Sequence, residues 1–387
     1  MEKGFFRLQL AVFALVSASF TNIYITQPIL PVLQDEFGVN PVQVSMTVSI
    51  VILGIVFSNL FFGYLADRIS IKPIIFAGGI CVAAGGTICA ITHDFGILIF
   101  ARFFQGLFIP ALTTSLAAWL ARTLPVNRLG VVMGSYVSAT VLGGLGGRLL
   151  GGWIHPPLHW RYAFLSASVL IVITTLLALT ALPAQQVKTI ETKDEQEGFL
   201  SLLMRKDLVS VYACGAGGLL MFSPVFNFLP YRLAGTPFNF STELITLTYL
   251  VYVLGIFLGP IAGRMSNYFG EGNTLIGGTC ILGFSFILLL IPSVIAMVIG
   301  LLCVCAGFFT IHSVAVVLLN KKLTRSHGKA NALYTLFYYI GGWIGITGAG
   351  FAFQKAGWKG VIFFVLCFLV IPLITGLSEK KANKLIK

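Results

Sequence analysis

Three basic side chains lie inside long apolar runs of the sequence, where they could bind an anion or carry a proton. Two are arginines, Arg102 and Arg148, and the third is His312. An arginine inside an apolar segment is costly and usually faces a cavity or a partner. Arg102 and Arg148 could hold an anionic group, bond to backbone carbonyls, or extend to the outer interface. His312 titrates in the physiological range and is a candidate proton carrier, with a hydrogen-bonded structural histidine as the alternative.

Uncharged polar side chains recur at roughly four-residue spacing within three of the apolar runs. Each set therefore shares one face of a helix. Such a face either lines a cavity or hydrogen-bonds to neighbouring helices, and both uses stay open. The residues are Asn22, Thr26 and Gln27 in the first run, Ser223 and Asn227 in the seventh, and Tyr334 and Tyr338 in the eleventh.

A short charged turn between two apolar runs contains Gly63, Asp67 and Arg68. A turn this short must place its charges at one face of a membrane. A similar pattern returns 196 positions later, with Gly259 and Arg264 in the places of Gly63 and Arg68. This spacing indicates that one half of the chain repeats the other.

A glycine-rich stretch in the fifth run reads Gly-Gly-Leu-Gly-Gly-Arg-Leu-Leu-Gly-Gly. Its glycines form a face along which a neighbouring helix can approach backbone to backbone. The packing motif comprises Gly143, Gly144, Gly147, Arg148 and Gly151. At a constant spacing of 198, this region meets counterparts in the second half: Gly143 and Gly341, Gly144 and Gly342, Gly147 and Gly345, and Trp160 and Trp358.

Membrane-spanning helices must position these residues. Of the 387 residues, 57% are hydrophobic and only 10% are charged, and the mean hydropathy is +0.94. No soluble domain needs so much apolar surface. A spanning helix takes about 20 apolar residues. Twelve such runs are present, at 8–30, 42–62, 73–92, 95–118, 129–153, 161–183, 207–229, 242–262, 273–292, 293–319, 330–353 and 358–377.

The expected fold is an all-α polytopic membrane protein of twelve transmembrane helices in two pseudo-symmetric six-helix halves. The N-terminal half is expected at 1–183 and the C-terminal half at 207–377. A cytoplasmic linker at 184–206, with a short surface helix around 198–206, joins them, and a cytoplasmic tail follows at 378–387.

Membrane topology explains the net charge of +12 better than a nucleic-acid partner does. With the N-terminus inside, 19 of the 25 Lys and Arg residues fall in cytoplasmic segments, as the positive-inside rule requires. Both termini are therefore predicted to be cytoplasmic. The seven cysteines lie inside apolar runs without zinc-ligand or redox spacing, so we expect no metal and no cofactor.

Several of these motifs resemble those of a known family. The sequence Gly-Tyr-Leu-Ala-Asp-Arg from Gly63 is similar to the signature between spans 2 and 3 of the major facilitator superfamily of transporters. Ser70 and Ile71 depart from that signature, which prefers glycine and a basic residue in their places. The run Arg102-Phe-Phe-Gln-Gly resembles another element of the superfamily. Pro28, Pro31 and the glycine-rich fifth span resemble features of twelve-span drug:proton antiporters, in particular the YnfM-like efflux group.

The resemblance implies an alternating-access transporter in a bacterial inner membrane that exports a small organic solute or drug in exchange for protons. The two charged turns would then act as a conformational latch, with loop charges that only set topology as the alternative. The latch residues are Gly63, Asp67, Arg68, Gly259 and Arg264. The predicted cavity residues are Asn22, Thr26, Gln27, Arg102, Asn227, His312, Tyr334 and Tyr338.

Proton coupling would need a titratable group, and the candidates are Asp35, Glu36 and His312. The 13 acidic residues lie at span ends, in loops or in the linker, and none lies mid-span. Antiporters of cationic drugs normally use a buried acid, so this pattern argues against a cationic cargo.

Other functions are less well supported. Arg102 and Arg148 prompt one alternative, the uptake or exchange of an organic anion. A non-transporting sensor would carry a large signalling tail, which we do not expect here. An enzyme is not expected either, because the spans contain no nucleophilic or metal-binding arrangement. The expected partners are a small-molecule substrate, protons and the lipid bilayer, and the protein is expected to act as a monomer.

Overall fold

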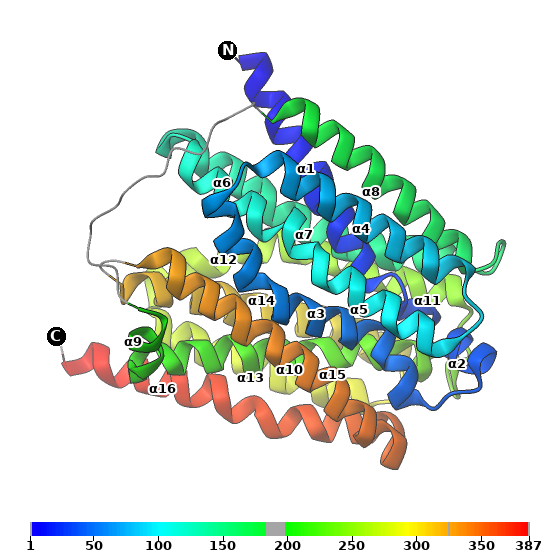
Figure 1. The fold of residues 1–387 in the computed structure, drawn as a ribbon. Helices are drawn as coiled ribbons and strands as arrows, with labels where there is room; N and C mark the ends of the chain where they lie inside the picture. The colour runs from blue at the N-terminus through cyan, green and yellow to red at the C-terminus, as the bar shows by residue number, and fades with distance from the viewer. Residues whose placement is uncertain (1, 183–197, 324–325, 386–387) are drawn as a thin grey trace. The chain divides into compact units, whose positions relative to one another are not determined.

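The computed structural model describes residues 2–182, 198–323 and 326–385, and every regular element in these ranges is a helix (Figure 1). The elements are α1 (Glu2–Tyr24), η1 (Gln27–Ile29), α2 (Leu30–Phe37), α3 (Pro41–Arg68), α4 (Ile71–Ile91), α5 (Phe95–Leu112), α6 (Thr114–Thr123), α7 (Val126–Ile154), α8 (Arg161–Ala181), α9 (Phe199–Met204), α10 (Lys206–Ala234), α11 (Thr242–Thr248), η2 (Tyr249–Val253), α12 (Leu254–Phe269), α13 (Glu271–Leu290), α14 (Val294–Lys321), α15 (His327–Leu366), η3 (Cys367–Leu369) and α16 (Val370–Leu385).

Long apolar helices make up most of the described chain. Ten stretches are long and apolar enough to cross a membrane. One of them, Gly328–Ala382, contains two of the predicted spans, because its backbone is non-helical at Ala356 and Gly357. Helix α7 adds a further segment of 29 residues. The described ranges thus accommodate the twelve predicted spans, and the prediction of an all-α polytopic membrane protein is confirmed.

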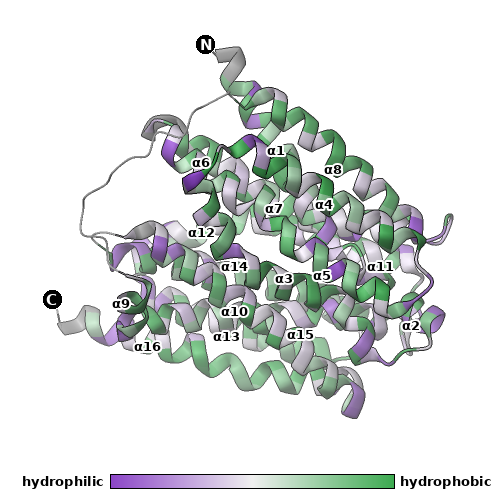
Figure 2. Cartoon of the chain, in the orientation of Figure 1, coloured by the Kyte–Doolittle hydropathy of each residue, from purple (hydrophilic) through white to green (hydrophobic). Residues whose placement is uncertain are grey.

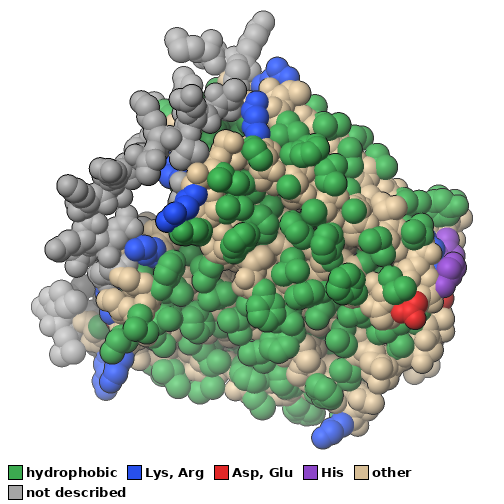
Figure 3. Space-filling model, in the orientation of Figure 1, with side chains coloured by type: hydrophobic (Ala, Val, Ile, Leu, Met, Phe, Trp, Pro, Cys, Tyr) green, Lys and Arg blue, Asp and Glu red, His purple; other side chains and the backbone are tan. Residues whose placement is uncertain are grey.

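The outer surfaces of these helices are strongly apolar. Phe57, Phe100 and Ile295 are 66%, 68% and 72% exposed. Figure 2 shows hydrophobic residues along the lengths of the helices and hydrophilic residues mainly near their ends. Figure 3 shows a face covered largely by hydrophobic side chains, with Lys and Arg mostly at its margins. Helix surfaces as apolar as these suit contact with lipid.

The first span is interrupted at its proline pair. Helix α1 ends at Tyr24, the 3₁₀ turn η1 contains Pro28, and α2 begins at Leu30. Proline has no N–H to donate, and the carbonyls in the last turn of any helix have no intrahelical partner. The first span is therefore broken here, and it presents carbonyl oxygens of α1 to neighbouring helices.

The chain forms two compact units. Unit 1 comprises Met1–Val39, Met46–Thr192 and Ser241–Tyr249, and unit 2 comprises Asn40–Ser45, Lys193–Phe240 and Leu250–Lys387. The units follow the two predicted halves except for two short segments, Asn40–Ser45 and Ser241–Tyr249, each of which belongs to the unit built mainly from the other half.

The two units use the same helix pairs in equivalent roles. In unit 1, α1 packs along α7 and α8, and α4 packs against α5 and α8 (Figure 1). In unit 2, α10 packs along α15, and α13 packs against α14 and α16. The short helix α9 lies where a surface helix was predicted in the linker. The preceding part of the predicted linker, residues 184–197, lies outside the described residues.

Candidate functional site

In each unit, a repeated glycine face brings two helices together backbone to backbone. In unit 1, a Cβ atom added to Gly147 would lie 2.2 Å from the carbonyl oxygen of Thr21. In unit 2, a Cβ atom added to Gly345 would lie 2.4 Å from the carbonyl oxygen of Leu220. Similarly close approaches are made by Gly143, Gly151 and Gly341. Only glycine fits at these contacts, so the glycine repeat in the sequence corresponds to a repeated helix crossing.

The guanidinium of Arg102, in α5, is fully buried and is held mainly by backbone carbonyls. Its Nε donates to the carbonyl oxygen of Thr47 at 2.8 Å. Nη1 donates to the carbonyl oxygen of Asn22 at 2.7 Å, and Nη2 donates to that of Ile23 at 2.8 Å. Nη1 also donates to Oε1 of Gln105 at 2.7 Å. Arg102 thus ties three spans together at the C-terminal end of α1, where a positive charge is favourable.

Arg148, in α7, is 1% exposed, so its side chain is buried. Its Nε donates to Oε1 of Gln27 at 2.7 Å, and its Nη1 donates to the carbonyl oxygen of Gly144 at 2.6 Å. The guanidinium carbon lies 4.2 Å from the ring centroid of Tyr24 and 5.4 Å from that of Tyr249. Two tyrosine rings and an amide therefore surround this buried cation.

The other predicted cavity residues of the first span are also hydrogen-bonded within unit 1. The amide Nδ2 of Asn22 donates to the carbonyl oxygen of Ala18 at 2.9 Å, and its Oδ1 accepts from Gln105 at 3.3 Å. Thr26 accepts a hydrogen bond of 3.2 Å from Thr47. In this structure the polar face of the first span links helices.

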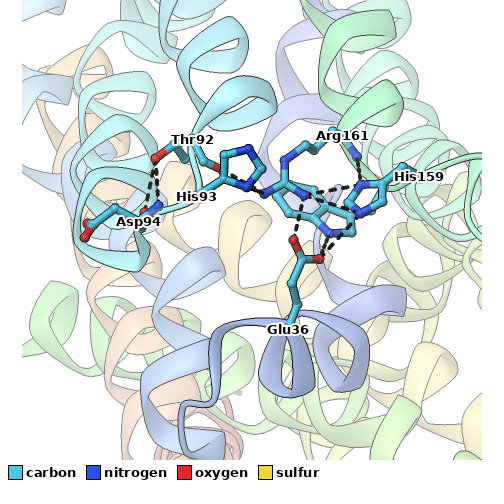
Figure 4. A network of polar contacts seen from close by, with 7 residues as sticks. Glu36, Thr92, His93, Asp94, His159 and Arg161 are labelled. Atoms are coloured by element: carbon cyan, nitrogen blue, oxygen red, sulfur yellow. Dashed lines mark hydrogen bonds and ion pairs between the residues drawn. The ribbon is translucent and has the colours of Figure 1, made fainter.

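A charged cluster lies at the end of unit 1 opposite the Gly63 turn (Figure 4). Glu36 accepts from Nη1 of Arg161 at 2.6 Å and from the indole N–H of Trp160. Nη2 of Arg161 donates to the carbonyl oxygen of Thr92 at 2.8 Å. His159 lies 3.7 Å from the second carboxylate oxygen of Glu36. This cluster joins α2 to the α4–α5 turn and to the start of α8.

Two further residues complete the cluster drawn in Figure 4. Nη2 of Arg161 lies 3.1 Å from Nδ1 of His93, and because a guanidinium only donates, this nitrogen must accept. Asp94 caps α5 by accepting from the N–H of Ile97 at 2.8 Å. Asp35, the neighbour of Glu36, is exposed. Of the two acids considered for proton coupling, Glu36 therefore forms an ion pair, whereas Asp35 is not part of the cluster drawn in Figure 4.

Unit 2 brings together the predicted polar residues of the seventh, tenth and eleventh spans in two groups. Nδ2 of Asn227 donates to Oγ of Ser45 at 3.1 Å. Separately, Nδ1 of His312 lies 3.0 Å from the hydroxyl of Tyr334, and its ring centroid lies 4.8 Å from that of Tyr338. His312 and Tyr338 are half-buried, whereas Asn227 is fully buried.

The predicted latch residues occupy matching places in their units. A Cβ atom at Gly63 would lie 3.7 Å from Thr114 in α6, and one at Gly259 would lie 3.4 Å from Ser313 in α14. Arg68 is exposed and lies 4.6 Å over the ring of Tyr64. Arg264 is also exposed. The side chain of Asp67 lies outside the described residues.

Several contact residues were not predicted as site residues. These are Tyr24 and Tyr249 beside Arg148, Gln105 beside Arg102, and Trp160, His159 and Arg161 around Glu36. The 198-residue spacing between Trp160 and Trp358 is the sequence signal that could have marked Trp160 as a contact residue. Trp358 repeats the buried indole in unit 2, where its Nε1 donates to the carbonyl oxygen of Leu289 at 2.8 Å.

The family model and the curated relatives that match this chain indicate the same family. Residues 12–345 match the model of the Major Facilitator Superfamily. The chain is 31% identical to the inner membrane transport protein YnfM of Escherichia coli (strain K12), covering 96% of this chain and 90% of that protein. It is 27% identical to the MFS-type transporter YybF of Bacillus subtilis (strain 168), covering 95% and 92%.

Solved structures show the same fold. A bacterial homolog of the human lysosomal transporter Spinster, in an inward-facing and unoccupied conformation, matches with a TM-score of 0.81 at 14% identity, covering 98% of each chain. A variant of the nucleoside transporter NupG matches with a TM-score of 0.77 at 13% identity, covering 96% of this chain and 99% of that one. With its repeated glycine crossings and its membrane-spanning helices, the chain belongs to the major facilitator superfamily and is a multi-pass membrane transporter of a small-molecule substrate.

Proposed function

We propose that this chain exports a small organic solute across a bacterial inner membrane in exchange for protons, acting as a monomer with both termini in the cytoplasm. The similarity to YnfM, an inner membrane transport protein, supports the membrane. The excess of Lys and Arg in the predicted cytoplasmic segments supports the orientation.

The repeated glycine crossing is the observation that carries this proposal. Gly147 against Thr21 and Gly345 against Leu220 lock a pair of spans in each unit at backbone contact. Packed interfaces of this kind move as rigid bodies rather than deform. Two such units in one chain suit alternating access, in which one half rocks against the other around the cargo. The resemblance of the fifth span to that of exporters supports the direction.

His312 is the proton-binding residue in this proposal. It lies within α14, is half-buried, and contacts the hydroxyl of Tyr334. An ionisable residue inside a membrane span is a functional-site hypothesis by default. Glu36 is a weaker candidate, because its carboxylate is bound by Arg161 and Trp160.

Exchange of an organic anion is the second candidate. Arg148 supports it, since a buried cation between tyrosine rings could recognise a carboxylate. Arg102 supports it less, because three of its hydrogen bonds go to backbone carbonyls.

Proteoliposome transport tests both candidates. Purified protein would be reconstituted with an imposed pH gradient, and a compound library would be screened for solutes that dissipate the gradient. Export by proton exchange predicts that the active solutes accumulate in vesicles with an acidic interior. Accumulation in vesicles with an alkaline interior, or competition by anions alone, would instead support the second candidate.

A further inference from the structure

Unit 2 contains a group of stacked rings that three different spans contribute. We define the aromatic column as Phe222 from α10, Phe308 and His312 from α14, and Tyr334 and Tyr338 from α15. The rings of Phe222 and Phe308 are stacked with centroids 3.8 Å apart and planes 17° apart. The rings of Phe308 and His312 are nearly parallel, at 9° and 5.9 Å.

The rings of the column differ in exposure. Phe222, Phe308 and Tyr334 are at most 4% exposed, whereas His312 and Tyr338 are half-buried. A histidine ring that faced lipid would leave its polar atoms without partners in hydrocarbon. The accessible side of His312 is therefore better suited to a solvated path or a bound solute than to lipid.

His312 supplies one directional contact on this aromatic surface. Its Nδ1 is engaged by the hydroxyl of Tyr334 at 3.0 Å, and among the described residues Nε2 has no hydrogen-bond partner. Whether Nε2 donates or accepts depends on the tautomer. A hydroxyl group can do either, so it matches Nε2 in both tautomers.

No described carboxylate of unit 2 faces the column. The three carboxylates described there form ion pairs near helix ends: Asp207 with Arg205, Glu271 with Lys321, and Glu379 with Lys322. Among the described residues, the column therefore presents flat, polarizable rings without a nearby carboxylate, and Nε2 of His312 is a hydrogen-bonding position on it. Flat rings favour offset stacking on such surfaces.

From these observations we propose that the aromatic column binds the cargo, and that the cargo is an uncharged planar aromatic solute carrying a hydroxyl group. The ring would stack on His312 and Tyr338, and the hydroxyl would hydrogen-bond to Nε2 of His312. This inference rests on the proposed transport of a small organic solute, which it narrows to a chemical class.

Binding to the full chain in lipid nanodiscs tests the inference without any gradient. Three probes separate the two contacts: 2-naphthol, which is planar with a hydroxyl; 2-methylnaphthalene, which is planar without one; and decahydro-2-naphthol, which has the hydroxyl but no aromatic ring. Equilibrium dialysis would measure each affinity, with binding to empty nanodiscs subtracted. The wild-type protein should bind 2-naphthol about fivefold more tightly than 2-methylnaphthalene, the ratio expected for one hydrogen bond. It should bind 2-naphthol about fivefold or more tightly than decahydro-2-naphthol, the ratio expected for aromatic stacking.

Two variants assign these ratios to residues. His312→Phe keeps a ring and removes Nε2, so the preference for the hydroxyl should disappear while the preference for the aromatic ring remains. Tyr338→Leu should reduce the preference for the aromatic ring and retain that for the hydroxyl. Phe363→Leu, at a 58% exposed ring of α15, is the matched control and should change neither ratio.

Each outcome bears on the inference. Equal wild-type affinities for 2-naphthol and decahydro-2-naphthol would overturn it, and so would an unchanged hydroxyl preference in His312→Phe. The unfolding midpoint of each variant would show whether a lost preference reflects a misfolded protein. If His312→Phe does not fold, the preference of Tyr338→Leu for the aromatic ring still tests the site. If the binding ratios hold but no proton-driven flux is found, the export proposal fails and the binding site stands.

Discussion

Arg102 donates a hydrogen bond of 2.8 Å to the carbonyl oxygen of Ile23, one residue before α1 ends at Tyr24. The break at Pro28 leaves the last carbonyls of α1 without helical donors, and Arg102 supplies two of the missing bonds, to Asn22 and Ile23. The arginine and the proline-broken helix are thus two parts of one structural feature.

Replacing Arg102 by lysine should destabilise the protein even though the charge is kept. Lysine lacks the planar fork that reaches several carbonyls at once. We expect a loss of roughly 3 kcal/mol, because at least two charge-assisted hydrogen bonds would be lost in a buried place. Thermal unfolding of the purified variant measures this loss. Wild-type stability combined with weaker binding of anions would show instead that Arg102 serves the cargo.

Replacing Gly147 by leucine should disrupt the crossing of α1 and α7. A Cβ atom alone would lie 2.2 Å from the carbonyl oxygen of Thr21, so the helices would have to separate. We expect a loss of roughly 3 kcal/mol and of transport. Gly134→Leu, on the same helix, is the control, since a Cβ atom there would meet nothing within 4 Å. Normal unfolding and transport in Gly147→Leu would disprove the close-packed crossing.

Glu36→Gln should lower stability without removing proton coupling. The carboxylate accepts from Arg161 and Trp160, and its side chain is only 29% exposed. Loss of this charge-assisted pairing should cost about 1–2 kcal/mol. The exposed Asp35 provides the matched variant, Asp35→Asn, which should change stability little. Transport by Glu36→Gln that no longer responds to the pH gradient would reassign coupling to this residue.

Stability should fall on acidification in part through His155, which follows α7. Burial and the nearby His159 hold the pKa of His155 below its usual value of 6.5, against the opposing effect of Glu243 and Glu36. The unfolded chain therefore binds a proton more readily than the folded one, and stability declines as the pH drops below that value. Unfolding midpoints of His155→Gln should decline less steeply between neutral and acidic pH. If the unfolding midpoints of the wild-type protein and of His155→Gln fell equally steeply with decreasing pH, His155 would not be a cause of the acid sensitivity.

Asp67→Asn should slow transport and leave the protein folded in the membrane, if the charged turns act as a latch. The variant removes the charge while keeping the size of the side chain. Initial rates in proteoliposomes should drop several-fold at unchanged unfolding midpoint. The exposed Arg264 of the second turn offers a parallel variant, Arg264→Gln. Full transport activity in both variants would disprove the latch, and the charges of Asp67 and Arg264 would then serve only to set the membrane topology.

The sequence was sufficient to predict the features that repeat along the chain. Apolar runs predicted the spans, and the 198-residue spacing predicted that Gly147 and Gly345 would lie at equivalent crossings, as they do against Thr21 and Leu220. The break in the first span also has a local cause, because Pro28 removes a helical donor wherever it occurs. These signals are local or periodic, so they can be recognised in the sequence without knowledge of tertiary contacts.

The partners of individual side chains could not be predicted. Hydropathy gives the extent of a span but not its rotation, and Arg102 reaches carbonyls 55 and 80 residues away in the chain, at Thr47 and Asn22. The same holds for the aromatic column, which needs the relative heights of three helices. Phe222 and Phe308 meet only because α10 and α14 pack together, and phenylalanine is too common in spans for their contact to stand out.

Gradient-driven flux in proteoliposomes tests the central claim most directly. With the vesicle interior acidic, addition of a planar hydroxylated aromatic solute to the wild-type protein should release the internal protons, and the His312→Gln variant should lose this release. Proton release that is unchanged in His312→Gln, or solute entry that requires an alkaline interior, would contradict a proton-exchanging exporter that works through His312.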